Sequence, residues 1–91
     1  MFRMWAKIWK DNHLLRDLTV SNGREDMTRT QKIFAGIEQV CHEFDLSVPI
    51  WLPANISAFK KHDKVRFSQD NFIDEIEFDY LELHVIEEDS W

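Results

Sequence analysis

The histidines and the carboxylates beside them are the first residues to weigh for chemistry. His42, Glu43 and Asp45 are close in sequence, but a helix points these positions in different directions, whereas a zinc-binding pair needs a spacing such as His-x-x-x-His. The other three histidines fall in separate segments. The sequence therefore predicts no metal and no other cofactor.

Signatures of catalysis are also missing from the pattern. The chain has two glycines and shows no glycine-rich phosphate loop, no nucleophile elbow and no catalytic Cys-His pattern. Nothing singles out an acid–base pair among the many carboxylates, so that alternative stays open. We therefore lean against an enzyme without deciding the question, and no catalytic residue is predicted.

The first unusual surface feature comes from residues 2–10, FRMWAKIWK. Read as a β-strand, this segment puts Arg3, Trp5, Lys7 and Trp9 on one face and apolar residues on the other. Read as a helix, it gathers aromatic residues on one side and basic residues on the other, as in a helix at a membrane surface. The β-propensity of the aromatic residues favours the strand.

Tryptophans flanked by cations are typical of protein interfaces, where Trp and Arg are enriched. We therefore take Arg3, Trp5, Lys7, Trp9 and Trp51 as a candidate interface. Two alternatives stand beside this hypothesis. Trp51 and its neighbours would cover the first strand as a second small core, or the tryptophans would stack single-stranded bases.

The second surface feature is a basic cluster formed by Lys60, Lys61, Lys64 and Arg66. Such a cluster is usually the solvated face of a short helix, and the alternative is contact with phosphates or with an acidic partner. The net charge is -6 and the pI is near 5.1, so the electrostatic field of the protein repels phosphates. The charge balance therefore argues against nucleic acid and membrane surfaces as partners.

A helix over residues 28–45 must organise the fold, because its apolar residues recur three and four apart. Thr28 and Gln31 form a capping box at its start. Gly36 costs helix stability and marks a close approach to the sheet. The predicted buried stripe consists of Ile33, Phe34, Ile37, Val40, Cys41 and Phe44.

The remaining elements give the order ββα(α)ββ. We expect a strand over residues 14–20, an extended passage over 49–53, a short helix over 56–62 and strands over 64–67 and 77–87, with 68–75 too mixed to assign. This order predicts an α+β fold in two layers, with the long amphipathic helix on one face of a largely antiparallel sheet of three to four strands. Residues 1–91 form one compact domain.

Charge predicts which strands are neighbours. Arg3 and Lys7 project from the first strand, and Glu82 and Glu87 project from the last. Opposite charges stabilise adjacent strands, so the first and last strands should lie side by side.

Three features indicate a cytoplasmic protein. Cys41 is the one cysteine and has no partner for a disulfide within the chain. No apolar run reaches the roughly 18 residues of a membrane span. The first ten residues lack the apolar core of a signal peptide.

Over most of its length the chain resembles a group of short uncharacterised proteins of anaerobic Gram-positive bacteria. The likeness runs through MFRMWAKIWKDNHLL, KIF, EFDLS, PIWL, FKKHDKVRF and FIDEIEFDYLELHVIEED. It implies a bacterial cytosolic origin, no known activity and no functional residues to carry over.

The leading functional hypothesis is a small non-enzymatic module for protein interaction or self-association, such as a homodimer. One alternative is a ligand-binding protein or enzyme with a cleft beside residues 49–53. A further alternative is a binder of nucleic acid or membrane surfaces through the basic residues.

Overall fold

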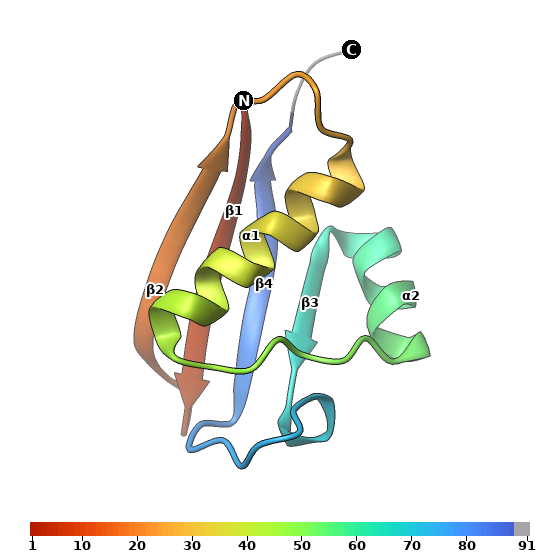
Figure 1. The fold of residues 1–91 in the computed structure, drawn as a ribbon. Helices are drawn as coiled ribbons and strands as arrows, with labels where there is room; N and C mark the ends of the chain where they lie inside the picture. Colours follow the sequence, from red (N-terminus) through yellow and green to blue (C-terminus); the bar gives the residue numbers. More distant parts are fainter. Residues whose placement is uncertain (89–91) are drawn as a thin grey trace.

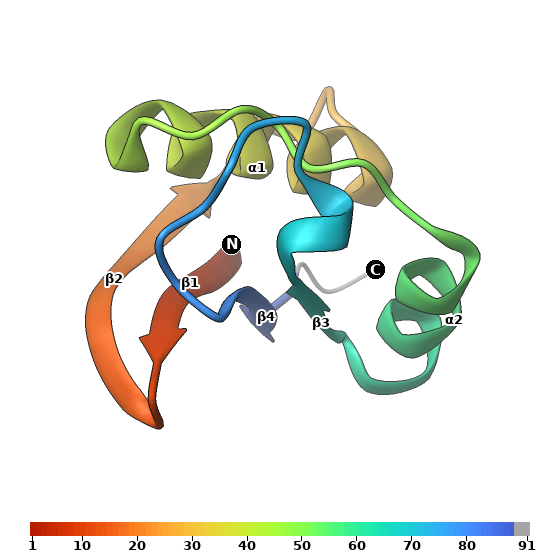
Figure 2. The same ribbon diagram turned by 90° about the horizontal axis from the view of Figure 1, so that it is seen from below.

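The computed structural model describes residues 1–88, which form a four-stranded antiparallel sheet and two α-helices (Figure 1). The elements follow in the order β1 (Phe2–Lys10), β2 (His13–Asn22), α1 (Arg29–Phe44), α2 (Pro53–His62), β3 (Lys64–Phe67), the short 3-10 helix η1 (Gln69–Asn71) and β4 (Tyr80–Glu87). The predicted α+β class with an antiparallel sheet is confirmed. The prediction of one helix as the second layer is incomplete, because ten residues of α2 stand beside β3 (Figure 2).

The sheet has the strand order β2-β1-β4-β3, so the first and last strands are its two central strands. Their register sets Lys7 opposite Glu82, with 2.9 Å between Lys7 Nζ and Glu82 Oε1. Arg3 lies 3.9 Å from Glu87 on the same pair of strands. The prediction that the first and last strands lie side by side is confirmed.

Helix α1 begins at the expected capping box, in which the Gln31 backbone N–H donates to Thr28 Oγ1 and the Thr28 N–H donates to Gln31 Oε1. Gly36 lies against the sheet, since a Cβ atom there would be 2.8 Å from Met4 Cε on β1 and 3.2 Å from Val20 Cγ2 on β2. The close approach predicted at this glycine is confirmed. The helix ends at Asp45, whose φ of 56° turns the chain out of the helix.

The core lies between α1 and the sheet face that carries the even-numbered residues of β1. Because side chains alternate along a strand, every second residue of β1 is buried in this core, and α1 contributes the apolar side chains of one helix face. Phe34 was predicted in that stripe and is instead 47% exposed, because its ring lies beside Trp51, with 6.2 Å between the ring centroids. The largest fully buried side chains are Phe2, Phe67, Met4, Ile37, Leu81, Leu83, Val40, Val65 and Cys41.

The extended passage predicted over residues 49–53 ends at residue 52, because α2 begins at Pro53, three residues before the predicted helix. Asn55 ties this region together. Its Oδ1 accepts from the Leu52 backbone N–H, and its Nδ2 donates to the Arg66 carbonyl at 3.1 Å. The exposed edge of β3 is therefore partly covered, which limits unwanted strand pairing there.

The last strand begins at Tyr80 and not at residue 77, because a loop precedes it. That loop follows η1, which occupies part of the segment that the sequence pattern did not assign. The Asp79 N–H donates to the Trp9 carbonyl at 2.9 Å, and the Asp11 N–H donates to Asp79 Oδ2 at 2.8 Å. Within residues 1–88, no helix is both long enough and apolar enough to cross a membrane.

Candidate interaction surface on the open face of the sheet

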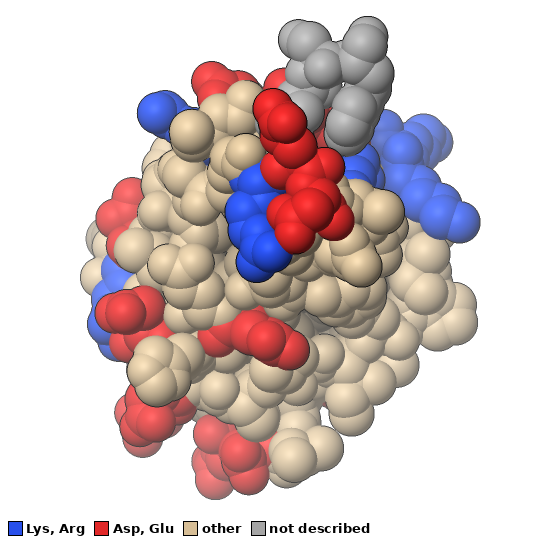
Figure 3. Space-filling model, turned by 45° about the horizontal axis from the view of Figure 1, so that its top comes forward, with Lys and Arg blue, Asp and Glu red and all other residues tan. Residues whose placement is uncertain are grey.

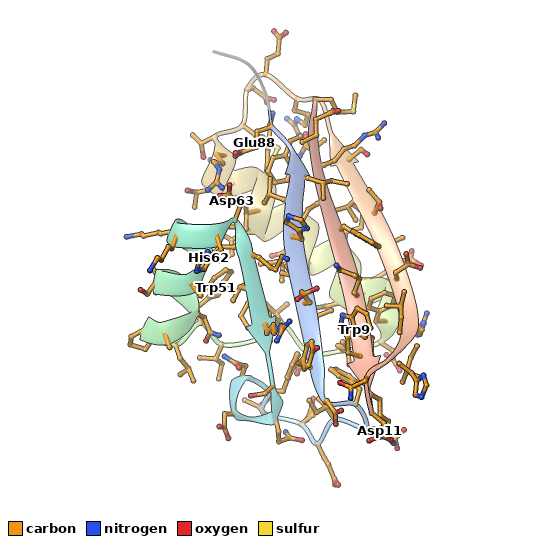
Figure 4. All side chains as sticks on the ribbon, turned by 180° about the vertical axis from the view of Figure 1, so that it is seen from behind. Trp9, Asp11, Trp51, His62, Asp63 and Glu88 are labelled. Carbon is orange, nitrogen blue, oxygen red and sulfur yellow. The ribbon has the colours of Figure 1, made fainter. Side chains whose placement is uncertain are left out.

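One face of the sheet has no helix over it within the described part of the chain. Figure 4 shows this face toward the viewer, with α1 behind the strands and α2 beside the β3 edge. Since Phe2, Met4, Ala6 and Ile8 point into the core, the odd-numbered residues of β1 point to the other side. We call this side the open sheet face.

The structure places Arg3, Trp5, Lys7 and Trp9 on the open sheet face, as the strand interpretation predicts. Trp51 does not belong with them. Its ring packs edge to face on Phe59 and Phe67, at centroid distances of 5.6 and 5.0 Å, on the side of the core.

The prediction that Trp51 joins this interface is therefore wrong, and so is the alternative that it covers the first strand. The physical reason is that Phe59 on α2 and Phe67 on β3 form an aromatic pocket in which the Trp51 ring packs. Phe34 adds a third edge contact there, at 6.2 Å.

Strand pairing arranges the open sheet face as rows that run from β2 across β1 and β4 toward β3. Ser21, Arg3 and Glu87 form a row at one end, and three further rows follow it. The pairing register defines every row. Of these three, the first row is Thr19, Trp5, His84 and Lys64; the second is Asp17, Lys7, Glu82 and Arg66; the third is Leu14, Trp9 and Tyr80.

Charges of opposite sign alternate along the second row. Glu82 accepts from Lys7 at 2.9 Å and from Arg66 Nε at 3.0 Å. Lys7 and Glu82 are buried, with 8% and 4% of their surface exposed, although they lie on a face without a covering helix. The Trp5 ring explains part of this burial, because the Lys7 ammonium lies 3.9 Å from its centroid.

The electrostatics of Glu82 reflect this crowding. Burial alone would raise the pKa of its carboxyl group, but hydrogen bonds and charge from Lys7 and Arg66 outweigh burial and leave the pKa below its ordinary value. The hydrogen bond to Glu82 likewise raises the pKa of Arg66. The row therefore sets the side chains of Lys7 and Arg66 around the buried Glu82 carboxylate, and Asp17 lies at its β2 end.

Half-buried aromatic side chains flank the charged row on both sides. The Trp5 Nε1–H donates to Asp17 Oδ2 at 3.0 Å, which fixes the indole over the β1–β2 pair. On the other side, Tyr80 lies under the Arg66 guanidinium, 4.7 Å from the ring centroid. Trp9 Nε1 is buried and has no acceptor among the described residues.

A bulge in β2 adds apolar surface near Trp9. The register shifts between Ile8 and Trp9, so Leu15 has no partner on β1. Leu14, which pairs with Trp9, and Leu15 are both exposed. The Trp9 end of the open sheet face is therefore its more apolar end.

The predicted basic cluster does not form one surface. Lys64 and Arg66 lie on β3 toward the open sheet face, and Arg66 is already engaged by Glu82. Lys60 lies on the wall of a groove beside Trp51, on the opposite side, and Lys61 is exposed on α2. The four cations spread over two faces because α2 and β3 project their side chains in different directions.

Acidic side chains further break up the basic surface. Arg29 is held by Asp63 at 2.9 Å and by Glu88, where the start of α1 meets the end of β4. Figure 3 shows basic and acidic side chains lying against each other at this end of the molecule.

Two hollows flank α2. One, of about 510 Å³, lies between α2 and β3 and is lined by His62, Lys64, Arg66 and His84 together with smaller side chains. His84 is partly buried there, and burial, followed by the charges of nearby lysines, lowers its pKa.

The other hollow is a groove of about 320 Å³ beside Trp51. It is mainly apolar, with Arg29 and Lys60 at its margin, and neither imidazole nor carboxylate lines it. Across residues 1–88, no three His, Cys, Asp or Glu side chains come together as metal ligands would.

Sequence reasoning did not find Asp17, Thr19 and Tyr80 as members of the open sheet face. The available signal was the two-residue periodicity of three strands. That signal becomes a surface only when the strand order and register are known.

Comparison with known proteins adds no assignment, because no family model, curated protein or solved structure matches the chain.

Proposed function

We propose that this protein is a non-enzymatic interaction module that binds a protein partner with the open sheet face. The observation that carries the proposal is the composition of this face. Trp5, Trp9 and Tyr80 are half-buried around a charged row whose central charges are already neutralised. A partner that covers these rings buries aromatic surface without having to desolvate an isolated charge.

Other features of the molecule support a protein partner over nucleic acid or a membrane surface. The net charge is -6, and the predicted basic residues lie on two different faces, where Arg66 and Arg29 already bind carboxylates. A phosphate polymer would therefore meet few free cations in any one place. The buried, unpaired Cys41 supports a reducing compartment and hence the cytoplasm.

The test is affinity capture from an extract of the source organism with three immobilised proteins: the wild type, Trp5→Ala/Trp9→Ala, and Phe34→Ala/Ile56→Ala as control. The control removes two exposed apolar side chains beside the groove on the opposite side. Circular dichroism verifies that each variant is folded.

We expect the sheet-face variant alone to lose a protein that the wild type retains, a copy of this chain included. Retention of every bound protein by that variant, or loss confined to the control, would overturn the proposal.

A second candidate function is ligand binding in the groove beside Trp51, where the alternative hypothesis placed a cleft. The groove offers apolar side chains and the cation Lys60 at its margin, which suits an amphipathic anion; Arg29, also at the margin, is already paired with Asp63 and Glu88. Titration with a fatty acid tests it. Quenching or a shift of tryptophan fluorescence in the wild type, but not in Phe34→Ala/Ile56→Ala, supports it, and an equal response in both proteins contradicts it.

A further inference from the structure

The charged row has a symmetry that identifies one particular partner. From β2 to β3 its members are Asp17, Lys7, Glu82 and Arg66, so the signs run negative, positive, negative, positive. Reversing this order turns every charge into its opposite. A surface with this property is complementary to a reversed copy of itself.

A two-fold axis parallel to the strands produces that reversed copy. In such a dimer, residues on β2 face residues on β3 of the second copy, and β1 faces β4. Asp17 then meets Arg66 of the second copy, and these are the charges available for contact. Asp17 is exposed, and the Arg66 side chain is 61% exposed, whereas Lys7 and Glu82 are covered.

The other in-plane axis is disfavoured by the same charges. A two-fold axis perpendicular to the strands superposes the charged row on itself without reversal. Asp17 would then face Asp17 and Arg66 would face Arg66, which is repulsive. Electrostatics therefore selects the axis parallel to the strands.

The aromatic rows fit the same arrangement. Under this axis Trp9 faces Tyr80 of the second copy, and Trp5 faces His84. Two sheets packed face to face keep their strands within about 30° of each other and lie about 10 Å apart. Side chains of this size fill such a space.

We infer that the open sheet face binds a second copy of this chain about a two-fold axis parallel to the strands, an inference that rests on the proposed function. One sheet face is the whole interface of such a dimer, so we expect the dimer to be weak and to dissociate on dilution. Thr19 is its most useful probe, because the axis sets this exposed residue opposite Lys64 of the second copy.

The experiment is sedimentation velocity over a wide concentration range on four proteins: the wild type, Thr19→Glu, Thr19→Lys and Trp5→Ala/Trp9→Ala. Thr19→Glu should tighten the dimer and Thr19→Lys should weaken it. Each substitution acts twice per dimer, so the two dissociation constants should differ by about tenfold. The tryptophan variant should be a folded monomer.

A control substitution separates this effect from net charge. Ser57 is exposed on α2, so Ser57→Glu and Ser57→Lys change the net charge in the same way without entering the sheet face. These two variants should leave the dissociation constant unchanged. Equal effects at residues 19 and 57 would overturn the inference.

The remaining outcomes distinguish this inference from the proposed function. If the wild type stays monomeric at every concentration, the inference that the face binds a second copy is overturned. The capture experiment then still decides whether the face binds another protein. A dimer that survives in Trp5→Ala/Trp9→Ala forms through another surface and overturns the inference, while the capture experiment again decides the proposed function. A dimer that needs the tryptophans, but in which Thr19→Lys binds as tightly as Thr19→Glu, overturns the two-fold arrangement and leaves the proposed function standing.

Discussion

Replacing Glu82 with glutamine removes the one anion that neutralises both Lys7 and Arg66 on the open sheet face. The substitution keeps the size of the side chain and one acceptor oxygen. It leaves the Lys7 ammonium with 10% of its side chain exposed and without the carboxylate that lay 2.9 Å away, whereas Arg66 remains largely in water. The loss in the free energy of unfolding should therefore come mainly from the unpaired Lys7 ammonium.

Removing one partner of a buried ion pair typically costs 3–5 kcal/mol, as a rough range. Because Arg66 stays hydrated and glutamine still accepts one hydrogen bond, we expect a loss near or below the lower end, about 2–3 kcal/mol. For a domain of this size that loss lowers the melting temperature by roughly 10–20 °C. The double variant Lys7→Met/Glu82→Leu removes both charges and should recover to within about 1 kcal/mol of the wild type.

Urea unfolding followed by circular dichroism near neutral pH measures these differences. Glu87→Gln is the matched control, since it lies on the same strand and removes the same charge. Glu87 and Arg3 are about half exposed and 3.9 Å apart, so this change should cost less than about 0.5 kcal/mol. Equal losses in the two single variants would refute the reasoning.

The pH dependence gives an independent check. The pKa of Glu82 is lower in the folded state than in the unfolded chain. Its contribution is therefore complete above the unfolded value of about 4.3 and disappears as the pH falls through the lower folded value. The wild type should lose its advantage over Glu82→Gln in this acid range, and an advantage that persists at lower pH would contradict the assignment.

Three further predictions concern the core. Gly36→Val should lower the free energy of unfolding by about 1–3 kcal/mol, because its side chain meets the sheet; Glu38→Val, at an exposed position of the same helix, should cost less, and equal costs in urea unfolding would argue against close packing. Burial raises the pKa of the Cys41 thiol to about 11, so a thiol reagent should modify it only after unfolding, and rapid modification of the folded protein would show that it is accessible. Trp51→Ala should cost about 3 kcal/mol through loss of its three ring contacts, and a thermal melt unchanged from the wild type would contradict this.

Local periodicity was enough to predict the elements that the sheet face depends on. The alternation in residues 2–10 and the 3.6-residue period of α1 are properties of contiguous chain, and both faces follow from them. The charges at Lys7 and Glu82 also predicted the pairing of β1 with β4 from the sequence alone.

Features that depend on distant contacts were not readable in the same way. Trp51 lies in an extended passage. Its ring packs on the core side of the sheet because it contacts Phe59 and Phe67, which come later in the chain. The bulge at Leu15 shifts the register of β2 by one residue, and a sequence pattern does not reveal such a shift. The rows of the open sheet face therefore required the structure.

The indole N–H signals of the tryptophans provide the most direct test of the open sheet face as a contact surface. Trp5 and Trp9 lie on that face, whereas Trp51 lies on the side of the core. In nuclear magnetic resonance spectra recorded at increasing protein concentration, we predict that the Trp5 and Trp9 signals shift and the Trp51 signal stays in place. Self-association that moves the Trp51 signal and leaves the Trp5 and Trp9 signals unchanged would contradict the account.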